Sequence, residues 1–288
     1  MKTIEFWLAR LLLATLSATS LPTANRLARA YVRLLDMALP RLRRTALKNL
    51  EMAGFAGRER ITTGVFNSIA RLVVAFARFP QITRANVREW IDYEGLDNFE
   101  RARGRGKGVL VATAHLGNWE LSAFANAYLA APMHIVVRPI DNAGIDALVE
   151  RYRALSGNHV ITKKDAARGI LRALHAGEAV GILIDQNTTP AEGVFVDFFG
   201  IKACAGSAFV KLAHHSGAAV VPGYAVWSEG AGRYVLHFEP EVEMTGDVGA
   251  DTQQVHARLE AAIRKYPDQW LWVHRRWKTR PPGEKPIY

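Results

Sequence analysis

Short, continuous apolar runs recur through the C-terminal two thirds of the chain, and helical patterns separate them. The first run, Val109–Ala114, follows Gly108 and is rich in β-branched residues. Runs that are apolar at every position are typical of strands buried on both faces of a parallel sheet. Four further runs are interpreted as strands in the same way: Met133–Arg138, His159–Thr162, Ala179–Ile184 and Ala218–Val226. The alternating segment Tyr234–Glu239 is expected to form an edge strand.

Helical patterns fill the intervals between these predicted strands. We expect helices over Gly95–Arg103, Trp119–Ala130, Gly144–Leu155, Asp165–His175, Gly206–His215 and Thr252–Lys265. Asp165 is expected to be the N-cap of its helix, and Gly177 lies just beyond the C-terminal end of that helix. The alternation predicts an α/β fold with a mostly parallel central sheet flanked by helices.

The N-terminal part of the chain has a different pattern, and we predict a helical region over residues 1–90 before an α/β domain over 91–288. Phe6–Leu21 is apolar apart from Arg10. Its uncharged part would extend only about 17 Å as a helix, whereas a bilayer core is ~30 Å thick. Glu5 and the lack of a clean cleavage site argue against a secretory signal peptide.

A basic amphipathic segment follows Pro22. Its apolar residues recur at helical spacing, and its arginines lie on other faces (Leu27, Tyr31, Leu34, Leu35; Arg26, Arg29, Arg33). This pattern favours a helix attached to a membrane surface. The alternative, a helix that faces the protein core and exposes its arginines to water, is equally compatible with the pattern. A further helical stretch, Ile61–Phe79, ends at Pro80.

Composition narrows the class of protein. The chain has 288 residues, of which 49% are hydrophobic and 22% charged, so it is neither disordered nor an ordinary polytopic membrane protein. Its formal charge of +10 favours negatively charged partners. The single cysteine, Cys204, excludes an internal disulfide and a cysteine-rich zinc site. No nucleic-acid-binding motif is recognisable, so no nucleic acid partner is expected.

The candidate chemistry is concentrated where predicted strands end. His115 follows the first run directly, and Glu120 lies five residues later on the first turn of the next predicted helix. A carboxylate–imidazole contact is possible only if His115 is in the turn. Arg138 and Asp185 also lie at the carboxyl ends of predicted strands. Because these ends share one edge of a parallel sheet, we expect all of these side chains to line one cleft.

A neutral histidine held by a carboxylate is suited to act as a general base. The sequence has no Gly-x-Ser-x-Gly motif, so the base is expected to activate a substrate hydroxyl or water directly. Metal binding is a competing reading for His115 and Glu120, with His214 and His215 as further ligands. The sequence has no His-Glu-x-x-His motif, however, and adjacent histidines on a helix face different ways, so no metal is expected.

A basic, tryptophan-rich block lies near the C-terminus, over Trp270–Lys278. Mixed tryptophan and arginine side chains suit the interface between apolar and anionic groups at a lipid headgroup. An aromatic cluster that docks the tail on the sheet would give the same pattern, and the sequence does not distinguish the two.

The segment His115-Leu-Gly-Asn-Trp-Glu120 resembles the His-x4-Asp/Glu motif of the glycerolipid acyltransferases. More specifically, the chain resembles the lipid A biosynthesis lauroyl/myristoyl acyltransferase family. Four other blocks, in order along the chain, are similar to that family: Val137–Pro139, Ile184–Gln186, Gly193–Gly200 and Pro267–Lys278.

The resemblance implies an enzyme on the cytoplasmic face of the inner membrane, held as a monotopic protein or by a single N-terminal anchor. It implies transfer of a fatty acyl chain from acyl carrier protein, or acyl-CoA, to a hydroxyl of an anionic glycolipid such as a lipid A precursor, with no cofactor. A phosphatidylinositol-mannoside acyltransferase would share this logic, and a lipid or thioester hydrolase could use the same residue pair.

The resemblance also implies residue roles. His115 would be the general base and Glu120 would orient it. Arg138 would bind a phosphate or developing oxyanion charge, and Asp185 would position substrate or a neighbouring base. Asn118 would contact substrate, and the backbone N–H groups of Gly117 and Asn118 would contribute hydrogen-bond donors near the helix N-terminus.

Overall fold

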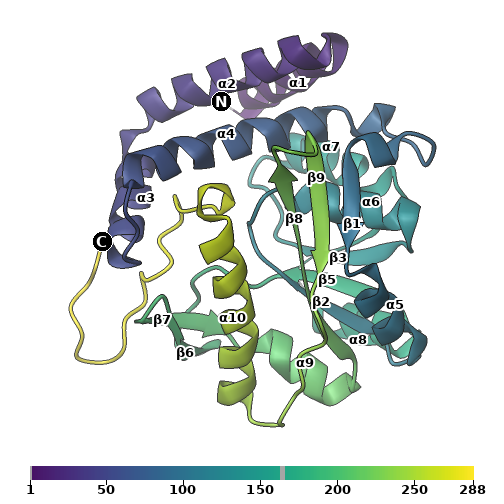
Figure 1. The fold of residues 1–288 in the computed structure, drawn as a ribbon, viewed down its shortest axis with the longest axis vertical. Helices are drawn as coiled ribbons and strands as arrows, with labels where there is room; N and C mark the ends of the chain where they lie inside the picture. Colours follow the sequence, from purple (N-terminus) through teal and green to yellow (C-terminus); the bar gives the residue numbers. More distant parts are fainter. Residues whose placement is uncertain (1, 163–165) are drawn as a thin grey trace.

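The computed structural model describes residues 2–162 and 166–288, and a mixed β-sheet covered by helices on both faces forms its centre (Figure 1). The described residues place seven strands in the order β1-β9-β8-β2-β5-β3-β4. Their bounds are β1 (Ile91–Glu94), β2 (Val109–Thr113), β3 (Met133–Val137), β4 (His159–Thr162), β5 (Ala179–Leu183), β8 (Ala219–Ser228) and β9 (Arg233–Phe238). Among the described strands of this seven-stranded sheet, only β8 and β9 pair antiparallel, so the predicted α/β fold with a mostly parallel sheet is confirmed.

The helices of the described residues are α1 (Lys2–Ala18), α2 (Leu21–Ala38), α3 (Pro40–Met52), α4 (Arg58–Ala77), α5 (Leu96–Gly104), α6 (Trp119–Leu129), α7 (Ala143–Ala154), α8 (Ala166–His175), α9 (Ala208–Ser216) and α10 (Val248–Lys265). The helices predicted between the strands are therefore present. The expected N-cap, Asp165, lies outside the described residues.

Strand β2 shows why the predicted strands are apolar throughout. Val109 and Val111 belong to a core cluster that includes residues of α4 and α6. Leu110 and Ala112 belong to a second cluster with residues of α8 and α9. Because successive side chains of a strand point to opposite faces, helices on both sides of the sheet require apolar residues at every position.

The prediction that Tyr234–Glu239 is an edge strand is wrong. Strand β9 lies inside the sheet, between β8 and the short strand β1. Strand β1 has the sequence Ile-Asp-Tyr-Glu. Because two of its four residues are charged, it lacks the apolar run by which the other strands were predicted. A separate antiparallel hairpin, β6 (Gly193–Phe198) and β7 (Ile201–Gly206), was also not anticipated.

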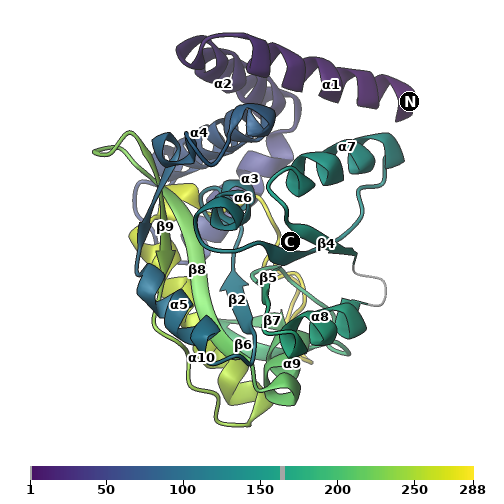
Figure 2. The same cartoon turned by 90° about the vertical axis from the view of Figure 1, so that its right-hand side faces the viewer.

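The N-terminal helices α1 and α2 lie on the far side of α4 from the sheet (Figures 1 and 2). Leu16 of α1 and Ala24 and Ala28 of α2 are fully buried in the cluster that continues through α4 to the sheet. Pro22 occupies the first turn of α2, where a missing N–H costs nothing. Among the described residues, no helix combines the length and the apolar character needed to cross a bilayer.

The C-terminal tryptophan-rich block is docked into the protein. Trp270, Trp272 and Trp277 are at most 2% exposed and pack in a cluster with Phe198 and Phe199 of the β6–β7 hairpin. This outcome favours the second of the two interpretations open from the sequence, an aromatic cluster that anchors the tail. The division of the chain at residue 90 stays a prediction.

Candidate active site

The loop between β2 and α6 presents His115 at the carboxyl end of the central strand. Gly117 in this loop has φ +64°, and a Cβ there would approach the Ala225 carbonyl oxygen to 1.9 Å, so only glycine fits. Asn118 caps α6, because its side-chain oxygen accepts a hydrogen bond from the backbone N–H of Leu121 at 2.9 Å. These constraints fix the turn that exposes the imidazole.

Neither backbone N–H that was predicted to bind substrate is free in this structure. The Gly117 N–H donates to the Gln269 carbonyl oxygen, and the Asn118 N–H donates to the Ala225 carbonyl oxygen, both at 2.8 Å. Asn118 itself is fully buried. The geometry therefore assigns Asn118 a structural role as a helix cap rather than the expected contact with substrate.

The carboxylate that contacts His115 is Asp185, not Glu120. His115 Nδ1 lies 2.8 Å from Asp185 Oδ1, and the His115 backbone N–H donates to Asp185 Oδ2 at 2.9 Å. The two residues meet because β5, which ends just before Asp185, pairs directly with β2. An ionised carboxylate only accepts hydrogen bonds, so Nδ1 carries the proton and the lone pair is on Nε2, which lies 3.4 Å from the side-chain amide nitrogen of Gln186.

The direct pairing predicted between Glu120 and His115 is wrong in this structure. The Glu120 carboxylate instead forms a two-point ion pair with Arg153 of α7, with contacts of 2.9 and 2.5 Å. Both side chains are mostly buried, 13% and 17% exposed. Five residues of spacing allowed a contact with His115, but the first turn of α6 directs Glu120 towards α7. Arg153 was missed because no sequence feature linked it to Glu120.

The electrostatics of the pair favour a base with strengthened proton affinity. Burial opposes protonation of His115, but the Asp185 charge and hydrogen bond, with a smaller contribution from Glu120, outweigh it and raise the pKa of His115. Burial would raise the pKa of Asp185, yet His115 and the Trp270 indole hold that pKa well below its usual range. Asp185 is therefore ionised at neutral pH.

An apolar cavity of about 600 Å³, including its open mouth, lies between the sheet and α6. Glu120 and Arg153 contribute to its wall, and Trp119, whose ring centroid is 5.0 Å from that of His115, lines it as well. Most other lining side chains come from one face of the sheet: Val111, Thr113, Met133, Ile135, Val137, Leu183, Leu236 and Phe238.

Arg138 is not part of this arrangement. It follows β3 at the same sheet edge, but it is exposed and does not line the cavity. Within residues 2–162 and 166–288 it has no ion-pair partner. The structure therefore brings together His115, Asp185 and Glu120 with its partner Arg153, and leaves Arg138 apart. The same described ranges contain no group of three potential metal ligands.

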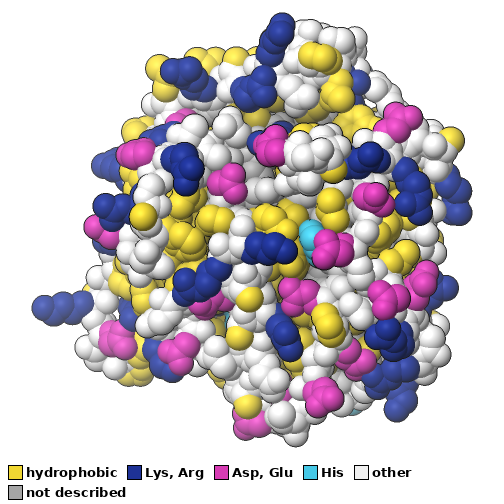
Figure 3. Space-filling view, viewed as in Figure 1, with side chains coloured by type: hydrophobic (Ala, Val, Ile, Leu, Met, Phe, Trp, Pro, Cys, Tyr) yellow, Lys and Arg dark blue, Asp and Glu magenta, His cyan; other side chains and the backbone are white. Residues whose placement is uncertain are grey.

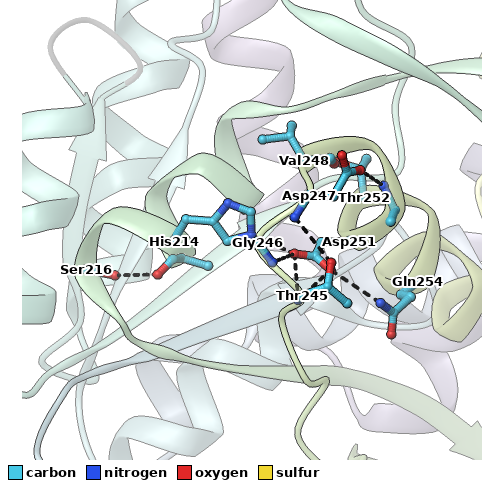
Figure 4. A network of polar contacts seen from close by, with 11 residues as sticks. His214, Ser216, Thr245, Gly246, Asp247, Val248, Asp251, Thr252 and Gln254 are labelled. Carbon is cyan, nitrogen blue, oxygen red and sulfur yellow. Dashed lines mark hydrogen bonds and ion pairs between the residues drawn. The ribbon is translucent and has the colours of Figure 1, made fainter.

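A second histidine–aspartate pair joins α9 to the start of α10 (Figure 4). His214 of α9 contacts Asp251 of α10 with Nε2 2.6 Å from Oδ2. Asp251 is fully buried and also accepts hydrogen bonds from the backbone N–H groups of Thr245 and Gly246 and from the Thr245 hydroxyl. This network holds the loop that leads into α10, and His214 does not line the cavity.

Comparison with known proteins supplies the family. A family model described as bacterial lipid A biosynthesis acyltransferase matches residues 1–279. The lipid A biosynthesis palmitoleoyltransferase of Escherichia coli is 33% identical over 262 residues, which cover 88% of this chain and 85% of that protein. The lauroyltransferase of the same organism is 30% identical over 68% of this chain and 65% of its own length.

A further relative is named for a different acceptor. The phosphatidylinositol mannoside acyltransferase of Mycolicibacterium smegmatis is 27% identical over 69% of this chain and 66% of that protein. All of these relatives are named as acyltransferases, and this chain is an acyltransferase too. The chain belongs to the bacterial lipid A biosynthesis acyltransferase family.

Proposed function

We propose that the enzyme transfers a fatty acyl chain from an acyl-carrier-protein thioester, or acyl-CoA, to a hydroxyl of a lipid A precursor. The observation that carries this proposal is the His115–Asp185 pair, whose imidazole packs beside Trp119, a residue that lines a predominantly apolar cavity. The cavity suits the hydrocarbon tail of the donor. The pair suits transfer of a proton from the acceptor hydroxyl to the thiolate that leaves the donor. Membership in the family supports the glycolipid acceptor.

In the proposed reaction, the acceptor hydroxyl takes the place of the Gln186 amide at Nε2 of His115, and Nε2 takes the proton of that hydroxyl. The acceptor oxygen then forms a bond to the thioester carbonyl carbon, and the carbon–sulfur bond breaks. The thiolate leaves with the proton from the imidazolium. Asp185 holds the reactive tautomer and stabilises the transient positive charge, as a carboxylate behind a histidine base does in hydrolases.

Glu120 has a supporting role in this proposal rather than direct contact with the base. Its anion contributes to the proton affinity of His115, and its ion pair with Arg153 fixes one wall of the cavity beside Trp119. An ion pair that is nearly closed to water is costly to break, since the remaining charge is left without compensation. Arg138 remains a candidate to bind an anionic group of a substrate from its exposed position.

Helices α1 and α2 are proposed to bind the cytoplasmic face of the inner membrane. They expose large apolar side chains: Ile4, Trp7, Leu8, Leu11, Leu34, Leu35 and Met37. Exposed arginines lie on the same helices and on the start of α3: Arg10, Arg26, Arg29, Arg33, Arg41 and Arg44. Hydrophobic and basic side chains intermix on this end of the molecule (Figure 3), as expected for a surface that meets anionic lipid.

Vesicle binding tests this surface. Leu8→Ser and Leu11→Ser together should weaken flotation with phosphatidylglycerol vesicles by about tenfold, because both side chains are 61% exposed and contribute apolar burial only on the membrane. Leu155→Ser, at an exposed site after α7, is the matched control and should bind as the parent does. Equal binding by all variants would contradict the proposed surface.

A second acceptor, a phosphatidylinositol mannoside, is suggested by the mycobacterial relative. The purified enzyme in detergent micelles should be given acyl carrier protein or CoA thioesters with each acceptor, and the products analysed by mass spectrometry. Acylated lipid A precursor is expected, and its loss in His115→Ala would assign the chemistry to the described site. Acylated mannoside alone would support the second acceptor. Free fatty acid without any acylated glycolipid would identify a hydrolase and contradict the proposal.

A further inference from the structure

The segment after α10 passes directly beneath the loop that carries His115. A single 3-10 turn, Pro267–Gln269, leads into it. The Gln269 carbonyl oxygen accepts from the Gly117 N–H at 2.8 Å, and the Leu271 N–H donates to the His115 carbonyl oxygen at 3.0 Å. The C-terminal segment therefore holds the histidine loop on both sides of Leu116, the residue that follows His115.

Trp270 lies between these two backbone contacts and reaches the aspartate of the pair. Its indole N–H donates to Asp185 Oδ2 at 2.7 Å, and both residues are 2% exposed. The same oxygen accepts the His115 backbone N–H, while Oδ1 faces His115 Nδ1. Two donors thus fix Oδ2, and this leaves Oδ1 for the imidazole.

We propose that Trp270 is a positioning residue for the catalytic histidine, acting through the carboxylate of Asp185. This inference rests on the proposed function for its effect on acyl transfer, but its structural part stands on the contacts alone. No sequence feature distinguishes Trp270 from the other two tryptophans of the same block.

Trp270 can orient His115 because its hydrogen bond restricts rotation of the Asp185 carboxylate. The terminal torsion of an aspartate is broad, so one hydrogen bond holds its two oxygens only loosely. The indole is itself immobilised by neighbouring rings, with centroid distances of 4.6 Å to Trp272 and 5.7 Å to Phe198. A donor fixed in this way holds Oδ2, and therefore orients Oδ1 towards the imidazole.

Trp272 provides a matched control. It is two residues away, fully buried, and its indole N–H donates at 2.7 Å to the Pro267 carbonyl oxygen instead of to Asp185. Trp270→Phe and Trp272→Phe therefore remove the same atoms and the same type of hydrogen bond from one cluster. A merely structural contribution of the tryptophans would affect both variants alike.

The test is an NMR titration of the histidine side chains, which needs no substrate and is therefore independent of the acyl-transfer proposal. In Trp270→Phe, the Asp185 carboxylate keeps only its two contacts with His115 and is less firmly oriented, so the His115 pKa should fall by about one unit, whereas Trp272→Phe should leave it in place. With acyl donor and glycolipid, kcat/KM should fall about tenfold in Trp270→Phe and less than twofold in Trp272→Phe. A His115 pKa that is unchanged or higher in Trp270→Phe would overturn the inference.

A measurement on the unaltered protein tests the same inference without relying on the folding of any variant. The resonance of the Trp270 indole proton should shift with pH and have the same midpoint as His115, because both donors share one carboxylate. The Trp272 indole proton should not follow that midpoint. A Trp270 resonance that is insensitive to the titration of His115 would also overturn the inference.

Discussion

The molecule contains two histidine–aspartate pairs with similar contacts, 2.8 Å between His115 and Asp185 and 2.6 Å between His214 and Asp251. Both aspartates are almost entirely buried. The pairs differ in what surrounds them. Asp185 joins two strand ends to the C-terminal segment, and its histidine contacts Trp119, which lines the cavity. Asp251 accepts the N–H groups of its own loop.

This difference shows that a short imidazole–carboxylate contact does not by itself identify an active site. The aspartate of a loop network stabilises the backbone that donates to it, and the histidine is one more donor. The aspartate at the sheet edge fixes a tautomer whose second nitrogen has a long contact of 3.4 Å with the Gln186 amide, which a substrate hydroxyl can replace. The two pairs can therefore be separated by experiment, because one should control activity and the other stability.

The largest expected difference comes from removing each histidine. His115→Ala should lose about 10²–10⁴ in kcat, the usual contribution of a general base. His214→Ala should keep the parent activity within about twofold, since His214 contacts the loop network of Asp251 and not Asp185 or the cavity wall. Turnover of acyl donor and glycolipid, with thermal unfolding of both variants as a check on folding, measures the contrast. Similar activity losses in the two variants would remove the functional distinction between the pairs.

A smaller effect is expected from narrowing the cavity, which lies near the His115 pair and not near the His214 pair. Gly181 lines it from β5, and a Cβ there would meet Met133 Cε at 3.4 Å, an ordinary contact. Gly181→Val should favour acyl donors about two carbons shorter, with about a fourfold penalty in kcat/KM for each excluded methylene.

Gly206→Val is the control for that change. Gly206 also lies in a strand, β7, where an added Cβ meets nothing within 4 Å, and it does not line the cavity. Competition between donors of different length should give the parent preference in this control. An unchanged preference in Gly181→Val would place the acyl chain elsewhere.

The smallest effect on activity is expected at Asp251. Burial opposes its ionisation, but hydrogen bonds from Thr245 and His214 dominate and lower the pKa of Asp251. Its stabilising contribution is therefore present above the usual aspartate pKa of about 3.9 and is lost as the pH falls through the lower folded value. Asp251→Asn should lower Tm at pH 7 and show a weaker decline of Tm in acid, with activity near that of the parent. A parent-like Tm profile would contradict the structural role.

The sequence predicted the sheet well because burial on both faces requires runs that are apolar at every position, as in Val109–Ala114 and Ala179–Ile184. It did not reveal β1, since Ile91–Glu94 is short and half polar. The error at β9 follows from this omission. Local patterns report burial, whereas position within the sheet depends on which strands pair.

The candidate site was also predicted only in part, because local sequence does not show which distant residues come into contact. His115 and Asp185 were identified because each follows an apolar strand, and they meet because β2 and β5 are neighbours. Glu120 was chosen as the partner from chain spacing, but the direction of its side chain depends on Arg153 of another helix. The sequence marked Trp270 only as one tryptophan of the C-terminal block. Its contact with Asp185 depends on where the C-terminal segment packs.

The most direct test of the account is the pH dependence of kcat/KM in the parent enzyme and in Asp185→Asn. A general base must be neutral, and Asp185 raises the pKa of His115, so activity in the parent should fall on the acid side with a midpoint above the ordinary histidine value of about 6.5. In Asp185→Asn the plateau should drop and that midpoint should move to lower pH, because burial is then less strongly opposed. An acid midpoint that is identical in the two enzymes would contradict the assignment of His115 and Asp185 as base and orienting carboxylate.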